Sequence, residues 1–64
     1  MEKKIRILFE DLKQFIELCE CIGVTWFFSG DESNELELTL FANSTNLFTL
    51  FYRCGLLSIS IYQL

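Results

Sequence analysis

A pattern of strand, helix and strand occurs twice in this 64-residue chain, and it limits the possible folds more than any other feature. Residues 4–9 alternate between apolar and polar side chains, which is typical of a half-buried strand. Apolar residues then recur at helical spacing over residues 12–19. The β-branched and aromatic residues 24–28 predict a second strand. The first half of the chain is therefore predicted to form a strand, a helix and a strand.

The second half repeats this order. Residues 35–41 alternate with Leu on one side, and residues 43–46 supply several side chains suited to begin a helix. A helical apolar stripe follows over residues 47–54, and residues 57–62 alternate as a last strand. We expect both helices to end at a glycine, the first at Gly23, because glycine adopts the left-handed C-terminal conformation without steric cost.

Gly55 stands 32 residues after Gly23 and is predicted to end the second helix in the same way. The polar residues 29–34 between the two halves predict a hairpin loop. Two strand-helix-strand units joined by a hairpin form a four-stranded antiparallel sheet with both helices on one face. The sequence therefore predicts a single α+β domain over residues 1–64, a βαββαβ ferredoxin-like sandwich.

One alternative fold differs in the first residues. Ile5, Leu8, Phe9, Leu12 and Phe15 also fit a helical stripe. If residues 3–22 formed one helix, the order would be αββαβ.

Alternation divides the strand residues between the two faces of the predicted sheet. The apolar set expected to face the helices is Ile5, Ile7, Phe9, Val24, Trp26, Phe28, Leu36, Leu38, Leu40, Leu57, Ile59 and Ile61. The opposite face would then expose Leu8, Phe27, Phe41 and Tyr62 among hydroxyl and charged side chains. Because a domain of about 60 residues buries little surface, we expect these four residues to form an oligomer interface, and the chain to be a homodimer.

Charge is distributed unevenly along the chain. The net charge is −4, all acids lie in the first 37 residues, and Arg53 alone is charged after Glu37. Such a surface repels phosphate backbones, so we expect no direct binding of nucleic acid. It suits a protein partner with a basic surface. The acidic residues predicted to contact that partner are Glu10, Asp11, Glu17, Glu20, Asp31, Glu32 and Glu35.

Several classes of chemistry lack the residues they need. The sequence has no His and no nucleophile motif, so we expect neither an enzyme nor a cofactor. Cys19 and Cys21 are too close for the usual zinc spacing, and an odd total of three Cys argues against a disulfide framework. The longest uncharged run, residues 38–52, is shorter than the about 20 apolar residues of a membrane-spanning helix. We expect a cytoplasmic protein, in the host cytoplasm if the chain is phage-encoded.

Size and charge together suggest a non-catalytic protein-binding module. Phages and mobile elements encode small acidic inhibitors of nucleases and CRISPR effectors, and by analogy this chain would be an anti-CRISPR or nuclease-inhibitor type of protein. It would occlude a basic, nucleic-acid-binding site on its partner. Two alternatives remain open: a small-ligand-binding regulatory domain of ACT-like architecture, and a structural subunit that assembles through the apolar sheet face.

Overall fold

The computed structural model describes the backbone of residues 1–64 and every side chain except that of Glu32. Its elements are, in order, β1 (Glu2–Leu8), the short 3-10 helix η1 (Phe9–Asp11), α1 (Leu12–Ile22), β2 (Thr25–Glu32), β3 (Glu35–Phe41), α2 (Ser44–Leu56) and β4 (Ile61–Gln63). The predicted βαββαβ order is confirmed. The αββαβ alternative is wrong, because residues 2–8 pair as a strand.

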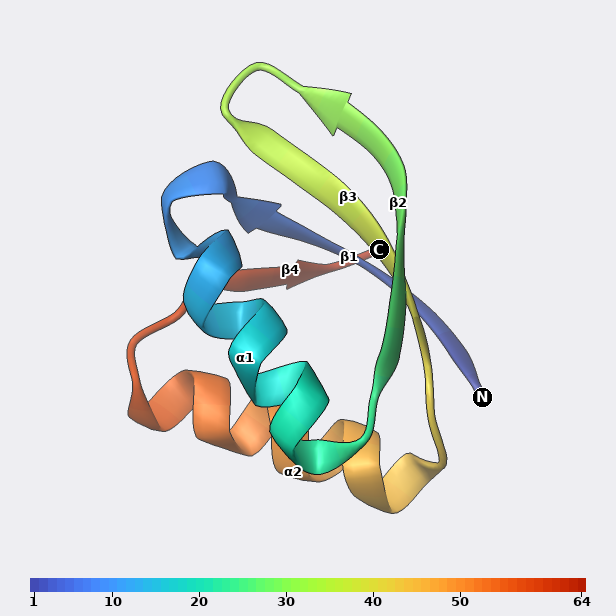
Figure 1. Cartoon of the computed structure of the whole chain (residues 1–64). Helices are drawn as coiled ribbons and strands as arrows, with labels where there is room; N and C mark the ends of the chain where they lie inside the picture. The colour runs from blue at the N-terminus through green and yellow to red at the C-terminus, as the bar shows by residue number, and fades with distance from the viewer.

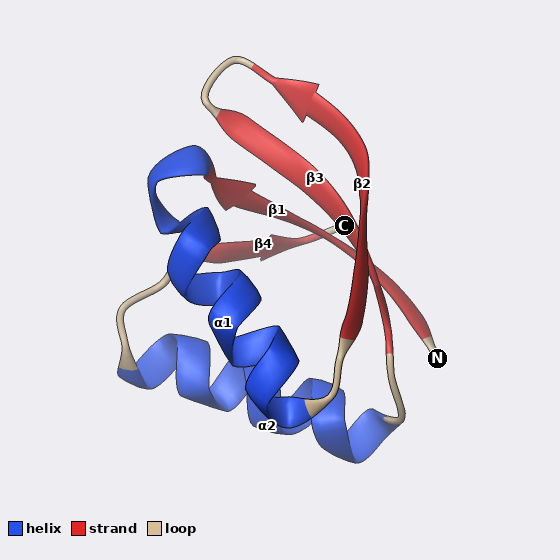
Figure 2. Cartoon of the chain, viewed as in Figure 1, coloured by secondary structure: helices blue, strands red, loops and turns tan.

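The four strands are arranged in the order β2-β3-β1-β4, and each pairs antiparallel with its neighbours. Each helix therefore connects two parallel strands that are separated by a third strand lying between them. Both helices pack on the same face of the twisted sheet, so the domain is a two-layer sandwich (Figures 1 and 2). The opposite face of the sheet is left open.

The core lies between the sheet and the two helices. Ile5 of β1 pairs directly with Leu38 of β3, and both are fully buried at the centre of the sheet. Helical spacing places Phe15 and Cys19 of α1 one turn apart against this layer. The remaining core residues are Ile7, Val24, Leu40, Leu47, Leu50, Cys54 and Ile59.

Three residues predicted for the core are exposed instead. Phe9 is 66% exposed because β1 ends one residue earlier and η1 turns the chain away from the sheet. Phe28 is 57% exposed because it lies on the edge strand β2, which has a neighbouring strand on one side only. Leu57 is exposed because it follows the last turn of α2 instead of beginning a strand.

The ends of α1 are set by backbone geometry. Gly23 has a φ of 95°, and its N–H donates to the carbonyl of Cys19 over 2.8 Å. This is the left-handed termination predicted for the first helix, which is confirmed. The start of α1 follows directly on η1, so Glu10 and Asp11 lie in the 3-10 turn and not in the helix itself.

The start of α2 agrees with the prediction from the sequence, but its end does not. The Oδ1 atom of Asn43 accepts a hydrogen bond from the N–H of Asn46 over 2.8 Å, so the predicted N-cap is confirmed. The predicted stop at Gly55 is wrong, because the helix includes Gly55 and continues to Leu56. The chain turns afterwards at Ser58, whose φ is 59°.

The last strand and the hairpin also differ from the prediction. Ile59 is buried, but its N–H donates to the carbonyl of Cys54, and β4 begins only at Ile61. The predicted loop over residues 29–34 is mostly strand, because β2 continues to Glu32 and the turn is limited to residues 33–34. A bulge between Phe28 and Gly30 shifts the register of β2 and allows it to continue.

Candidate interaction surfaces

Two separate segments of the chain form an acidic end of the molecule. The N–H of Phe9 donates to the carbonyl of Asn34 over 2.9 Å, which holds η1 against the β2–β3 turn (Figure 1). Glu10 of η1 and Asp31 of β2 are exposed there. The half-buried acids at this end are Asp11 and Glu35. We define these four residues, Glu10, Asp11, Asp31 and Glu35, as the acidic end.

The other predicted acidic residues do not belong to this end. Glu17 and Glu20 are exposed further along α1. Lys13, also exposed, lies one turn from both Glu10 and Glu17 and separates the two groups of acids. The side chain of Glu32 lies outside the described residues. The six predicted acids whose side chains are described are therefore divided between the acidic end and α1.

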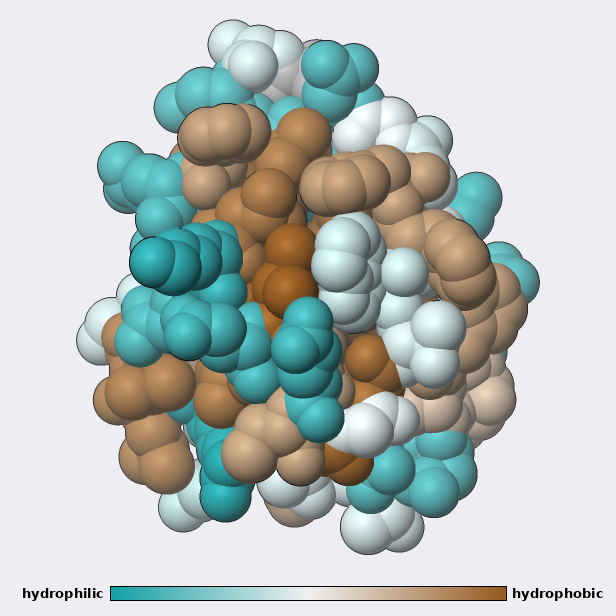
Figure 3. Space-filling view, viewed as in Figure 1, coloured by the Kyte–Doolittle hydropathy of each residue, from teal (hydrophilic) through white to brown (hydrophobic). Residues whose placement is uncertain are grey.

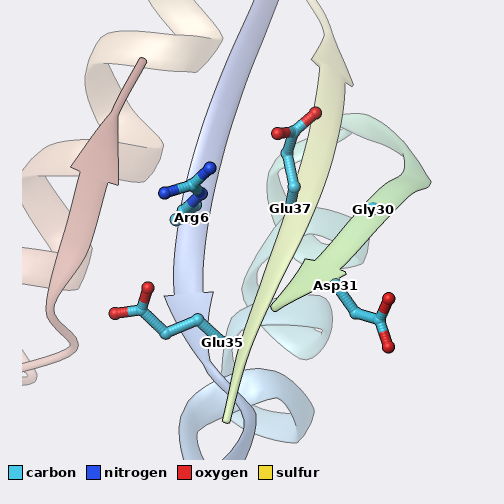
Figure 4. A pocket seen from close by; sticks show the side chains of 5 residues that line it. All are labelled: Arg6, Gly30, Asp31, Glu35 and Glu37. Carbon is cyan, nitrogen blue, oxygen red and sulfur yellow. The ribbon is translucent and has the colours of Figure 1, made fainter. Parts of the chain in front are cut away.

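The open face of the sheet has a charged centre. Arg6 of β1 is paired directly with Glu37 of β3, and both are half-buried. Glu37 also accepts a hydrogen bond from the hydroxyl of Ser29 over 3.0 Å. Figure 4 shows Arg6, Glu37 and Glu35 on this face, around a hollow of about 80 Å³, whereas Asp31 points away from them. The two central strands thus present opposite charges side by side.

The four residues predicted to form an oligomer interface lie on this face as two pairs. Phe27 and Phe41 contact each other edge to face at one corner, with ring centroids 5.7 Å apart. Leu8 and Tyr62 line a hollow of about 200 Å³ at the opposite edge of the sheet. Tyr62 is 68% exposed and is paired directly with Arg6. The open face therefore consists of two apolar corners separated by a charged centre.

An apolar stripe on the outer face of α2 was not predicted from the sequence. Phe48 and Tyr52 stack with their centroids 6.3 Å apart, and Leu56 follows one turn later. All three are exposed, Phe48 by 70%. Leu56 also lines a hollow of about 280 Å³ with Leu18, Arg53 and Leu57. The signal in the sequence was the spacing 48, 52 and 56, which marks a second face of the helix beside the core stripe of Leu47, Leu50 and Cys54.

A second apolar surface lies on the helix side of the sheet. Figure 3 shows apolar side chains between the polar outer face of α1 and strand β2. Phe28 and Leu36 line a hollow of about 310 Å³ near the hairpin, together with Gly30 and Asp31. This surface exists because the two helices do not cover the edge strand completely.

The three cysteines are free thiols. Burial raises the pKa of Cys19 to about 12 and that of Cys54 to about 11. Both thiols are therefore protonated and poorly nucleophilic at neutral pH, whereas Cys21 is exposed. Among the described side chains, no group of three His, Cys, Asp or Glu residues is arranged to hold a metal ion.

Within the described chain, no helix has the length and apolar character needed to cross a membrane. No protein-family model matches the sequence, and no curated protein matches it significantly.

Proposed function

We propose that this chain is a non-catalytic protein-binding module whose acidic end docks on a basic surface of a partner protein. The observation that carries the proposal is the hydrogen bond from Phe9 to Asn34, which brings acids from two segments of the chain to one end. A basic surface of this kind often serves to bind nucleic acid, and a bound acidic protein would block it. The chain would then act as an inhibitor of the anti-CRISPR or nuclease-inhibitor type.

Electrostatics supports the acidic end as the docking surface over the rest of α1. η1 and the hairpin turn carry acids and no base, whereas Lys13 interrupts the charge along α1. Among the four acids of this end, Glu35 lies near Arg6 of β1 on the open face. Opposite charges across an interface accelerate association and select the partner. The three free thiols fit a reducing compartment, so we place this activity in the cytoplasm, or in the host cytoplasm for a phage protein.

The experiment compares two charge reversals of equal size. The first variant combines Glu10→Lys and Asp31→Lys at the acidic end, and the control combines Glu17→Lys and Glu20→Lys on α1. All four side chains are exposed, so both variants should keep the fold. The partner is captured from the native host, and its affinity for each variant is measured by calorimetry at low and moderate salt.

We expect the acidic-end variant to bind at least about tenfold more weakly, which corresponds to about 1.4 kcal/mol. The control variant should lose much less affinity. Binding of the wild type should weaken as the salt concentration increases. Equal losses of affinity in the two variants would show that binding depends on the net charge of the chain and not on the acidic end, which would contradict the proposal. Unchanged affinity in the first variant, or a captured partner without a basic surface, would contradict the proposal.

A further inference from the structure

We propose that two copies of this chain pair face to face through the open face of the sheet, around a two-fold axis parallel to the strands. This inference and the proposed function are tested by different variants, although Glu35 belongs to both the acidic end and the open face. It rests on the arrangement of charges on the two central strands, β1 and β3, and on the exposed aromatic residues on the two outer strands.

The central strands carry opposite charges on their open side. Lys4 and Arg6 project from the middle of β1, whose first residue, Glu2, is an acid on the same side, whereas Glu35 and Glu37 project from β3. In the pairing of these strands Arg6 is level with Glu37, and Lys4 is level with Thr39. In the middle of the sheet, positive and negative charges are thus divided between two neighbouring strands, on either side of the midline (Figure 4).

This division fixes the direction of the symmetry axis. A two-fold rotation about the midline, parallel to the strands, places β1 of one copy over β3 of the other. Arg6 then faces the partner's Glu37, and the same contact occurs a second time by symmetry. A rotation about an axis perpendicular to the strands would instead place β1 over β1, so that Lys4 or Arg6 met a positive side chain whenever the axis crossed β1 between residues 4 and 6. Like charges in contact destabilise an interface, so the parallel axis is favoured.

The outer strands fit the same rotation. It places β4 of one copy over β2 of the other, and Tyr62 is level with Gly30 because both lie in the row of Arg6 and Glu37. Gly30 has no side chain, so it leaves space for the ring of Tyr62 from the other copy. Phe27, 55% exposed on β2, would be covered at the same time by the end of the partner's β4.

The available area is sufficient for a stable dimer. A specific interface covers about 800 Å² of each partner. That is roughly one fifth of the 4182 Å² that this chain exposes, and one broad face of a two-layer domain is of this order. Burial of the exposed aromatic residues would add stability to a domain of a size that is marginal alone.

The test uses two single variants and their mixture. Arg6→Glu gives one chain an acid at both positions 6 and 37. Glu37→Arg gives the other chain a base at both positions. We expect wild type to be a dimer by light scattering and native mass spectrometry, and each variant alone to dissociate at least about tenfold more readily. The equimolar mixture should form a heterodimer. Mixing cannot repair the contact between residues 6 and 37 within either chain, so recovery can come only from contacts between chains.

A control distinguishes this face from the apolar stripe of α2. The double variant Phe48→Glu and Tyr52→Glu removes that stripe but leaves the sheet unchanged, and it should remain a dimer. Circular dichroism confirms that each variant is folded. A monomeric wild type at the highest concentration reached, a mixture without heterodimers, or a dimer lost only in the α2 variant would each overturn the proposal.

Discussion

The two helices cover the same face of the sheet, but their outer surfaces have opposite chemistry. The outer face of α1 carries Lys13, Glu17 and Glu20, whereas that of α2 carries Phe48 and Tyr52. The inner faces are alike, because each presents an apolar stripe and a buried cysteine to the sheet. The same strand-helix-strand pattern has thus produced one helix suited to water and one with an apolar outer stripe. The shared pattern explains the packing of the two halves, and the outer residues give each half its own surface.

The largest expected effect tests whether matching positions in the two helices are equivalent. Leu50 of α2 is fully buried, whereas Leu18, 32 residues earlier in α1, is half-buried. Leu50→Ala should lower the free energy of unfolding by about 2–5 kcal/mol, since it leaves a cavity in the core. Leu18→Ala should cost clearly less. Urea unfolding followed by circular dichroism measures both values, and equal losses would mean that the two helices bury these positions alike.

The two glycines provide a second contrast, with effects of opposite sign. Gly23→Ala places a side chain at a φ of 95° and should cost about 1–2 kcal/mol of stability. Gly55 lies inside α2, and apart from its chain neighbours and the helix backbone no described atom is within 4 Å of an added Cβ. Gly55→Ala should therefore raise stability by about 0.5–1 kcal/mol. Thermal unfolding of both variants checks the signs, and a loss at Gly55 would show that this glycine has a role outside the helix.

These glycines also show how far the sequence determines the fold. Periodicity predicted the element order and most of the core, because burial on one face imposes a period of two in strands and near four in helices. It could not place the end of α2. A glycine permits the left-handed conformation without requiring it, and here Ser58 adopts it instead. The ends of elements depend on backbone hydrogen bonds, such as that from Ile59 to Cys54, which leave no pattern in the sequence.

The candidate site was predictable to a lesser degree. Alternation correctly placed Phe27, Phe41 and Tyr62 on the open face, since neighbouring residues of a strand point to opposite sides. It could not show that Arg6 and Glu37 are level on adjacent strands, because α1 and β2 lie between β1 and β3 in the sequence and no tight turn fixes the register of this pair. Nor could it reveal the acidic end, which depends on a contact between η1 and a distant turn.

A smaller effect is expected at the starts of the two helices. Asn43 caps α2 with its side chain, and Asn43→Ala should cost about 1 kcal/mol. In the described chain, the side chain of Asp11 makes no such bond at the start of α1. Asp11→Ala should therefore change stability by no more than a few tenths of a kcal/mol. Chemical unfolding of both variants tests this contrast, and a similar loss at Asp11 would indicate a cap that forms in solution.

The smallest effect on stability at neutral pH concerns the two buried thiols, Cys19 in the first half of the chain and Cys54 in the second. Burial raises the pKa of Cys19 to about 12, with further contributions from Cys54 and Glu20, and burial raises the pKa of Cys54 to about 11. Below pH 9 these thiols are protonated in the folded and the unfolded chain, so they do not affect stability. Above pH 9 the unfolded chain ionises first, and stability should fall as the pH rises through the folded values.

At pH 7.5 a disulfide reagent should modify Cys21 rapidly and the two buried thiols only after unfolding, so that Cys21→Ser removes the rapid phase. Rapid reaction of all three thiols in the folded protein would show that the helices separate easily from the sheet and let the reagent reach the core.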